Sequence, residues 1–166
     1  MESFWVESFR YNKWANLQLL ASCSGLTTAQ LRLTAPGTYG TIADTFLHLL
    51  GAEERYIRRL TNEEPTLSEK SDFPGIGALT DHATRTGDVL ISLSQRVKPG
   101  EILETKYQDR PYRMQAGVVL IQALHHGNDH RTHICTILGS NALPYTDMDV
   151  WSYGEASGAM GYVEDA

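Results

Sequence analysis

The chain has 166 residues and a mass of 18.5 kDa, a size that favours one domain spanning residues 1–166. Its 14 Lys and Arg against 20 Asp and Glu give a net charge of −6, which argues against a DNA- or RNA-binding protein, because such proteins carry a basic face. No segment approaches the roughly 20 apolar residues that cross a bilayer, and two cysteines, Cys23 and Cys135, are too few for a disulfide framework, so we expect a cytoplasmic protein without a signal peptide or a membrane anchor.

The spacing of apolar residues predicts two helices in the first part of the chain. From Ser3 to Cys23, apolar residues recur at three- and four-residue intervals without Gly or Pro, which is typical of a helix. After a stretch rich in Gly and Pro, Thr38 or Thr41 can cap a second helix that ends near Thr61. The segment 62–77 contains two prolines and several serines, so we expect a surface loop there.

The second half contains two more predicted helices. The third runs from Leu79 to Val97 and is closed by a Pro-Gly pair, and the fourth runs from Gln115 to Leu138 and ends at Gly139. Between them, Glu101–Met114 alternates loosely around Gln108–Pro111, which favours a short irregular hairpin or an extended crossing over a helix. A short C-terminal helix is expected near Met148–Ala156.

These elements predict an all-α fold. Four amphipathic helices of about 20 residues, each about 30 Å long, bury their apolar stripes most simply as a four-helix bundle. The long connections after the second and third helices allow crossovers, so the pattern alone does not fix the topology.

Histidine is the unusual feature of the composition, because four of the six lie within residues 125–133. His126 and His130 are four residues apart on a predicted helix, which places their side chains on one face and lets both nitrogens reach one ion. His133 lies about 10.5 Å along the axis from His126, so one straight helix cannot bring all three to the same ion. A third ligand must come from another helix, and both His48 and His82 are candidates that the periodicity does not separate.

The alternative is that the His-x-x-x-His spacing arose by chance or that these histidines have surface or core roles. Bundles commonly assemble metal sites from facing helices, and the clustering favours a metal over that alternative. Gly127 points the same way. A glycine inside a helix is about 1 kcal/mol less stable than alanine, which suggests a specific reason for it, such as the close approach of another group.

Several segments of the chain resemble the DinB-like superfamily, the metal-binding four-helix proteins that also include the YfiT-type hydrolases. They are Tyr11–Asn16, Gly40–Ile42 with His48–Glu53, and His126–Arg131. The resemblance implies one divalent ion bound by His48, His126 and His130, and so favours His48 over His82. Zinc or nickel is expected first, although imidazole ligands also accept iron, manganese or copper.

The sequence departs from that family beside the ligands. Asp129 stands where the last helix commonly has an additional His, and Thr132-His133 replaces Gly-Gln. His133 could therefore reach substrate, bind a water or only pack. Asp44 and Asp129 are candidates for orienting an imidazole, although Asp on a helix near solvent is usually only solvated. Arg131 could bind an acidic substrate group, but pairing with a neighbouring helix is favoured.

Three neutral nitrogen ligands leave a tetrahedral ion one open position, which is typical of catalytic sites. The resemblance to a family that includes thiol-dependent transferases favours a metal-dependent enzyme that transfers a low-molecular-weight thiol, with hydrolysis as the other reaction class. The alternative is a noncatalytic metal- or ligand-binding bundle with a structural or stress-response role. The same resemblance implies a homodimer, and the C-terminal aromatic residues, including Trp151 and Tyr153, either form a dimer contact or fold over the mouth of the bundle.

Overall fold

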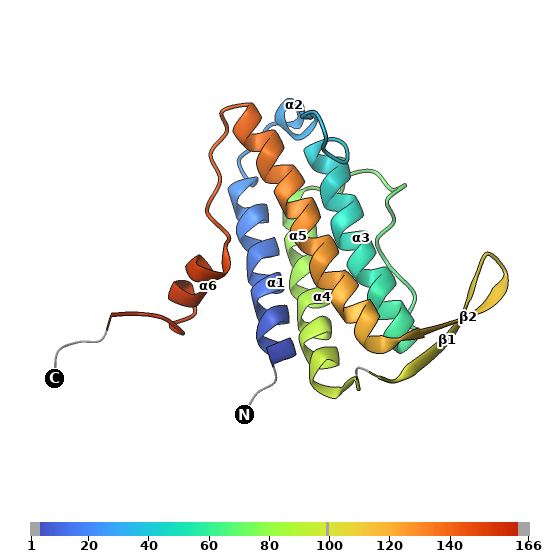
Figure 1. Ribbon diagram of the computed structural model, residues 1–166. Helices are drawn as coiled ribbons and strands as arrows, with labels where there is room; N and C mark the ends of the chain where they lie inside the picture. The colour runs from blue at the N-terminus through green and yellow to red at the C-terminus, as the bar shows by residue number, and fades with distance from the viewer. Residues whose placement is uncertain (1–3, 99, 163–166) are drawn as a thin grey trace.

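A computed structural model describes residues 4–98 and 100–162, which form six helices and one two-stranded sheet (Figure 1). Ser3, where we placed the start of the first helix, lies outside the described residues. The elements are α1 (Phe4–Ser22), α2 (Thr28–Leu31), α3 (Ile42–Thr61), α4 (Ile76–Arg96), β1 (Ile102–Tyr107), β2 (Arg110–Gln115), α5 (Ala116–Ser140) and α6 (Val150–Ala156).

Four long helices form the predicted bundle. α1 packs against α4 and α5, and α3 packs against the same two helices, so α1 and α3 lie on opposite corners. α3 and α4 run in the same direction, and the connection 62–75 therefore returns along the whole length of the bundle (Figure 1). This connection is one of the crossovers that the sequence allowed. No described helix is long and apolar enough to span a membrane.

The core between the four helices has two parts. One lies toward α2 and is built around buried side chains such as Leu19, Phe46 and Ile134. The other lies toward the hairpin and includes Phe9, Leu90 and Leu120. On α5, His126 and His130 lie between the residues that belong to these two apolar clusters.

The segment between α4 and α5 is the predicted hairpin rather than an extended crossing. β1 and β2 pair in antiparallel register, with Tyr107 opposite Arg110. Gln108 and Asp109 form the turn with φ of 48° and 59°, and positive φ at both central residues matches the right-handed twist of a two-residue hairpin. The hairpin extends from the end of the bundle where α3 ends and α5 begins (Figure 1).

The C-terminal segment packs beside α1 rather than over the histidines. The ring of Tyr153 lies 5.9 Å from that of Tyr11 and 5.6 Å from that of Trp14, and its hydroxyl donates to Glu7 at 2.5 Å. The prediction that the aromatic tail covers the mouth of the bundle is therefore wrong for these residues. Trp151 is 69% exposed and remains available for a contact with another molecule.

Candidate metal centre

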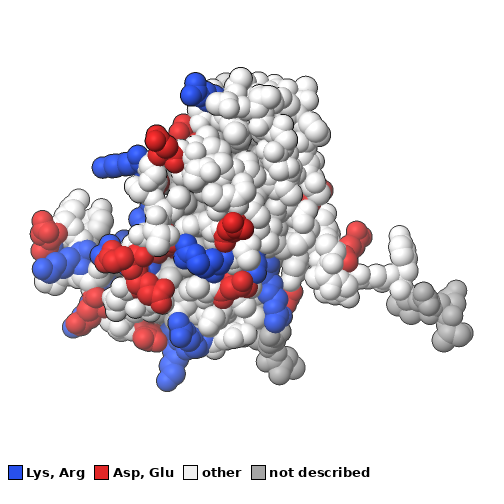
Figure 2. All heavy atoms as spheres, turned by 180° about the vertical axis from the view of Figure 1, so that it is seen from behind, with Lys and Arg blue, Asp and Glu red and all other residues white. Residues whose placement is uncertain are grey.

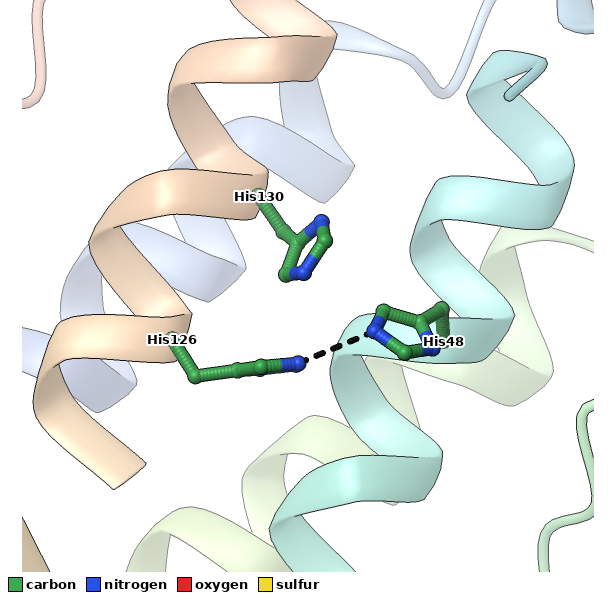
Figure 3. A group of neighbouring side chains, drawn as sticks. All are labelled: His48, His126 and His130. Carbon is green, nitrogen blue, oxygen red and sulfur yellow. Dashed lines mark hydrogen bonds between the residues drawn. The ribbon is translucent and has the colours of Figure 1, made fainter. Parts of the chain in front are cut away.

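Three histidines converge between the facing helices α3 and α5 (Figure 3). α3 contributes His48, and α5 contributes His126 and His130, one helical turn apart. The Nε2 atoms of His48 and His126 lie 3.0 Å apart, and one potential ligand atom from each histidine lies within 4.8 Å of the other two. Among the described residues, no fourth His, Cys, Asp or Glu joins this group.

This arrangement fits a divalent metal. Nitrogen ligands at about 2.0–2.1 Å from a tetrahedral ion are roughly 3.3 Å from one another, so small side-chain movements would close the group around an ion. The Nδ1 atoms of His126 and His130 are buried and have no hydrogen-bond partner among the described residues. At His126 the nitrogen that faces His48 is Nε2, and there both rings can offer a lone pair to one ion.

The electrostatics of the group favour the neutral imidazoles that bind metals. Burial, followed by the neighbouring histidines, lowers the pKa of His126 to about 3. Burial and the same kind of repulsion lower the pKa of His130 to about 4. Both side chains therefore carry free lone pairs at neutral pH, and no proton has to be removed before an ion binds.

Glu69, from the connection after α3, holds His48 in place. Its Oε2 accepts a hydrogen bond from His48 Nδ1 at 2.9 Å, and it also forms an ion pair with Arg55. Burial alone would raise the pKa of Glu69, but the bond from His48 and the charge of Arg55 outweigh it and lower that pKa. An ionised carboxylate at Nδ1 keeps the proton there and leaves Nε2 of His48 as the ligand atom.

Tyr39, in the connection before α3, covers one side of the histidine group. Its ring stacks on that of His48 at 4.0 Å and meets the ring of His130 edge-on at 5.3 Å. Its hydroxyl donates to Glu69 at 3.4 Å, and the residue is 48% exposed. Neither Glu69 nor Tyr39 was predicted, because no motif in the sequence marks a connecting segment that folds back onto a helix.

His82 belongs to a different polar cluster. It lies on α4, where its Nε2 is 3.6 Å from Glu54 and its Nδ1 is 3.1 Å from Arg85. Glu54 accepts hydrogen bonds from Arg85 and from the backbone of Thr66, so this cluster fastens the long connection to α3 and α4. Of the two candidates for the third histidine, the structure places His48, not His82, beside His126 and His130.

Asp44 and Asp129, the two aspartates proposed to orient an imidazole of the site, have other partners in the structure. Asp44 lies in the first turn of α3, where Oδ2 accepts from the backbone N–H of Thr41 at 3.3 Å, so the expected orienting role gives way to a helix cap. Asp129 is paired with His125 at 3.2 Å on the exposed side of α5. Residues adjacent in a helix are rotated by about 100°, which explains why Asp129 faces away from the group formed by His130.

His133 and Arg131 follow His130 on α5 and have different partners. The ring of His133 meets that of His130 edge-on at 5.1 Å, and its buried Nδ1 has no partner among the described residues. Arg131 points to α1 instead, where it donates to Asn12 at 2.8 Å and to Asn16 at 2.6 Å. Arg131 therefore pairs with a neighbouring helix, which is the interpretation that the sequence favoured over binding of an acidic substrate group.

Those two asparagines belong to a buried polar network that connects all four long helices, since Thr86 of α4 also donates to Glu53, at 2.9 Å. Asn12 and Asn16 each donate to Glu53 of α3 at 2.8 Å, so the network fixes how α5, α1 and α3 lie relative to one another. Burial raises the pKa of Glu53, although these hydrogen bonds act in the opposite direction. Gly127 makes room for this network, since a Cβ there would lie 2.5 Å from Oδ1 of Asn12. The expected close approach at Gly127 is confirmed.

Comparison with known proteins agrees with this architecture. The family model of the DinB family matches residues 1–150. A solved structure of a DinB-like protein from Bacillus cereus superposes with a TM-score of 0.66 at 18% sequence identity, covering 86% of this chain and 94% of that one. No curated protein matches the sequence.

Proposed function

Since the chain belongs to the DinB family, we propose that it binds one divalent metal through His48, His126 and His130 and is a metal-dependent enzyme acting on a small molecule. The observation that carries the proposal is a convergence of three imidazoles without a fourth protein ligand among the described residues. A structural ion is usually enclosed by four protein ligands, whereas a catalytic ion keeps one position for water or substrate.

Thiol transfer is the reaction that we favour. When bound, a zinc or nickel ion acts as a Lewis acid that favours the thiolate of a small thiol, or hydroxide, near neutral pH. The thiolate sulfur forms a bond to an electrophilic carbon, the leaving group departs with the bonding electrons, and the thiol proton passes to solvent. Hydrolysis at the same site is the second candidate, because water can occupy the position that the three histidines leave free.

The residues of this chain have separate tasks in that scheme. Glu69 holds the proton on Nδ1 of His48, so that the lone pair of Nε2 would be available to an ion. Tyr39 stacks on His48 and limits the approach to the site from its own side. No described residue stands out as a general base, and solvent therefore takes the thiol proton in this proposal.

The remaining parts of the proposal concern the setting of the protein. We propose zinc or nickel as the ion, because both suit imidazole ligands. The two unpaired cysteines suit a reducing compartment, and we propose the cytoplasm. A homodimer is also proposed, with exposed aromatic residues such as Trp151 suited to an interface.

The test combines metal analysis with a search for turnover in protein purified without a histidine tag. We expect one equivalent of metal per chain and consumption of a small thiol, such as cysteine, in the presence of 1-chloro-2,4-dinitrobenzene. The matched control is His126→Ala, which should lose both metal and consumption above the uncatalysed rate. Stoichiometric metal without turnover of thiols or of hydrolysable esters would support the noncatalytic alternative.

A further inference from the structure

A cleft separates the hairpin from α3 and α5 and begins beside the histidine group. Its nearer wall is Tyr56, whose ring lies 5.7 Å from that of His126, together with Gln122, whose Nε2 is 3.5 Å from the Tyr56 hydroxyl. Gln122 precedes His126 by one helical turn, which is about 6 Å along the axis. The cleft has a volume of about 450 Å³, within the range of small-molecule sites.

The hairpin presents aromatic side chains to this cleft. Tyr107 and Tyr112 line it, lie 5.8 Å apart between ring centroids, and are 61% and 49% exposed. Met114 lines the cleft from the same strand as Tyr112, and Val118 of α5, 56% exposed, lies on the opposite side. Aromatic rings over an apolar floor are stabilised when another flat apolar group fills the space between them.

Positive charge gathers at one end of the cleft. Arg59 lines both this cleft and an adjoining cavity of about 390 Å³ that Arg58 and Lys106 also line. Arg58 is paired with Glu64, whereas Arg59 has no ion pair with any described residue. Figure 2 shows that side chains of both charges are more frequent toward the hairpin end of the bundle than at the other end.

We propose that this cleft binds the organic body of the substrate of the histidine site, and that this substrate is a flat apolar molecule carrying an anionic group, such as an arene carboxylate. The inference rests on the proposed function. The ring lies between Tyr112 and the apolar side chains of α5, the anionic group pairs with Arg59, and the reacting end points along Gln122 toward His126. An arginine that forms no ion pair with a described residue can supply the charge complementarity that selects an anion.

The test uses 2-naphthoate and its neutral isostere 2-naphthamide as probes, with binding measured by titration calorimetry on the full chain. We expect one naphthoate per chain. Arg59→Gln should weaken naphthoate roughly fivefold, the effect of a solvent-accessible ion pair of about 1 kcal/mol, and leave naphthamide within about twofold. Tyr112→Ala should weaken both probes by roughly fivefold through loss of aromatic contact.

Matched controls lie at the other end of the bundle. Arg32→Gln and Tyr145→Ala change an exposed arginine and an exposed tyrosine away from the cleft, and neither should move either affinity by more than about twofold. Equal effects of Arg59→Gln and Arg32→Gln on naphthoate would overturn the proposal. So would a Tyr112→Ala protein that changes from dimer to monomer while its affinity for naphthoate stays the same, because a second copy would then be the occupant of the cleft.

Running the titration with and without one equivalent of zinc separates this inference from the proposed function. Naphthoate binding in metal-free protein supports the cleft even if the metal analysis fails. Stoichiometric zinc without any binding of naphthoate overturns the cleft and leaves the proposed metal site standing.

Discussion

Glu69→Ala tests whether the carboxylate behind His48 contributes to metal affinity. The carboxylate lies 2.9 Å from His48 Nδ1, and removing it frees both the tautomer and the orientation of the ring. Losing such an outer partner typically costs 10–100-fold in metal affinity. The Glu69 side chain is 30% exposed and shares its charge with Arg55, so we expect the lower end, about tenfold or 1.4 kcal/mol.

The assay is competition for zinc against a chelating dye, with far-UV circular dichroism to confirm that each variant is folded. Glu69→Gln should show a smaller loss, because its amide oxygen still accepts from Nδ1 without the charge. Glu64→Ala is the matched control, since Glu64 is in the same connection and pairs only with Arg58 among the described residues. Zinc affinity of a folded Glu69→Ala protein within about twofold of wild type would refute the reasoning.

Three further predictions follow from the same structure. His48→Ala should reduce the metal content of tag-free protein well below one equivalent, whereas His82→Ala should retain it, and elemental analysis showing full occupancy in the first variant would remove His48 from the site. Glu54→Gln should lower the free energy of unfolding by about 2 kcal/mol at neutral pH, because hydrogen bonds outweigh burial and hold the pKa of Glu54 below its ordinary value. That stabilisation is complete above the unfolded pKa and is lost as the pH falls through the lower folded pKa, so urea unfolding of the two proteins should converge in acid. Gly127→Ala should destabilise the fold by about 1–2 kcal/mol despite the helix propensity of alanine, because its Cβ would lie against Oδ1 of Asn12, and an unchanged melting temperature would contradict this.

The sequence predicted those parts of the structure that depend on regular spacing. The four long helices follow from the apolar periodicity, and the placement of His126 and His130 on one face follows from their four-residue separation. The hairpin followed from the change of period after the third helix. Helix ends differed by one to three residues where fraying and capping decide them, as at Val150 and Ser140.

Other features could not be predicted, because they depend on how connections lie over the bundle. Glu69 reaches His48 only because the segment 62–75 runs back along α3, and nothing in its local sequence specifies that path. α2 is a single turn, too short for a periodic signal. The turn at Gln108 and Asp109 adopts positive φ without glycine, a conformation that residue preferences do not favour.

Polar residues of the helices were harder to interpret than apolar ones. The i,i+4 pair Asn12 and Asn16 carries the same spacing signal as His126 and His130, but it supports a buried network instead of a ligand site. At Asp44 a local interaction replaces the role that we expected. This residue of the first turn caps α3 instead of orienting a histidine. Spacing places side chains on a face, and the neighbouring helix decides their partners.

X-ray absorption at the zinc edge is the most direct test of the central claim that three imidazoles of α3 and α5 surround one ion with an open position. Protein loaded with one equivalent of zinc should show about three nitrogen ligands at roughly 2.0–2.1 Å with imidazole scattering, plus one light donor. His126→Ala, which should not hold stoichiometric zinc, should not give this three-imidazole spectrum. A sulfur ligand at roughly 2.3 Å, or a spectrum unchanged in His126→Ala, would contradict the account.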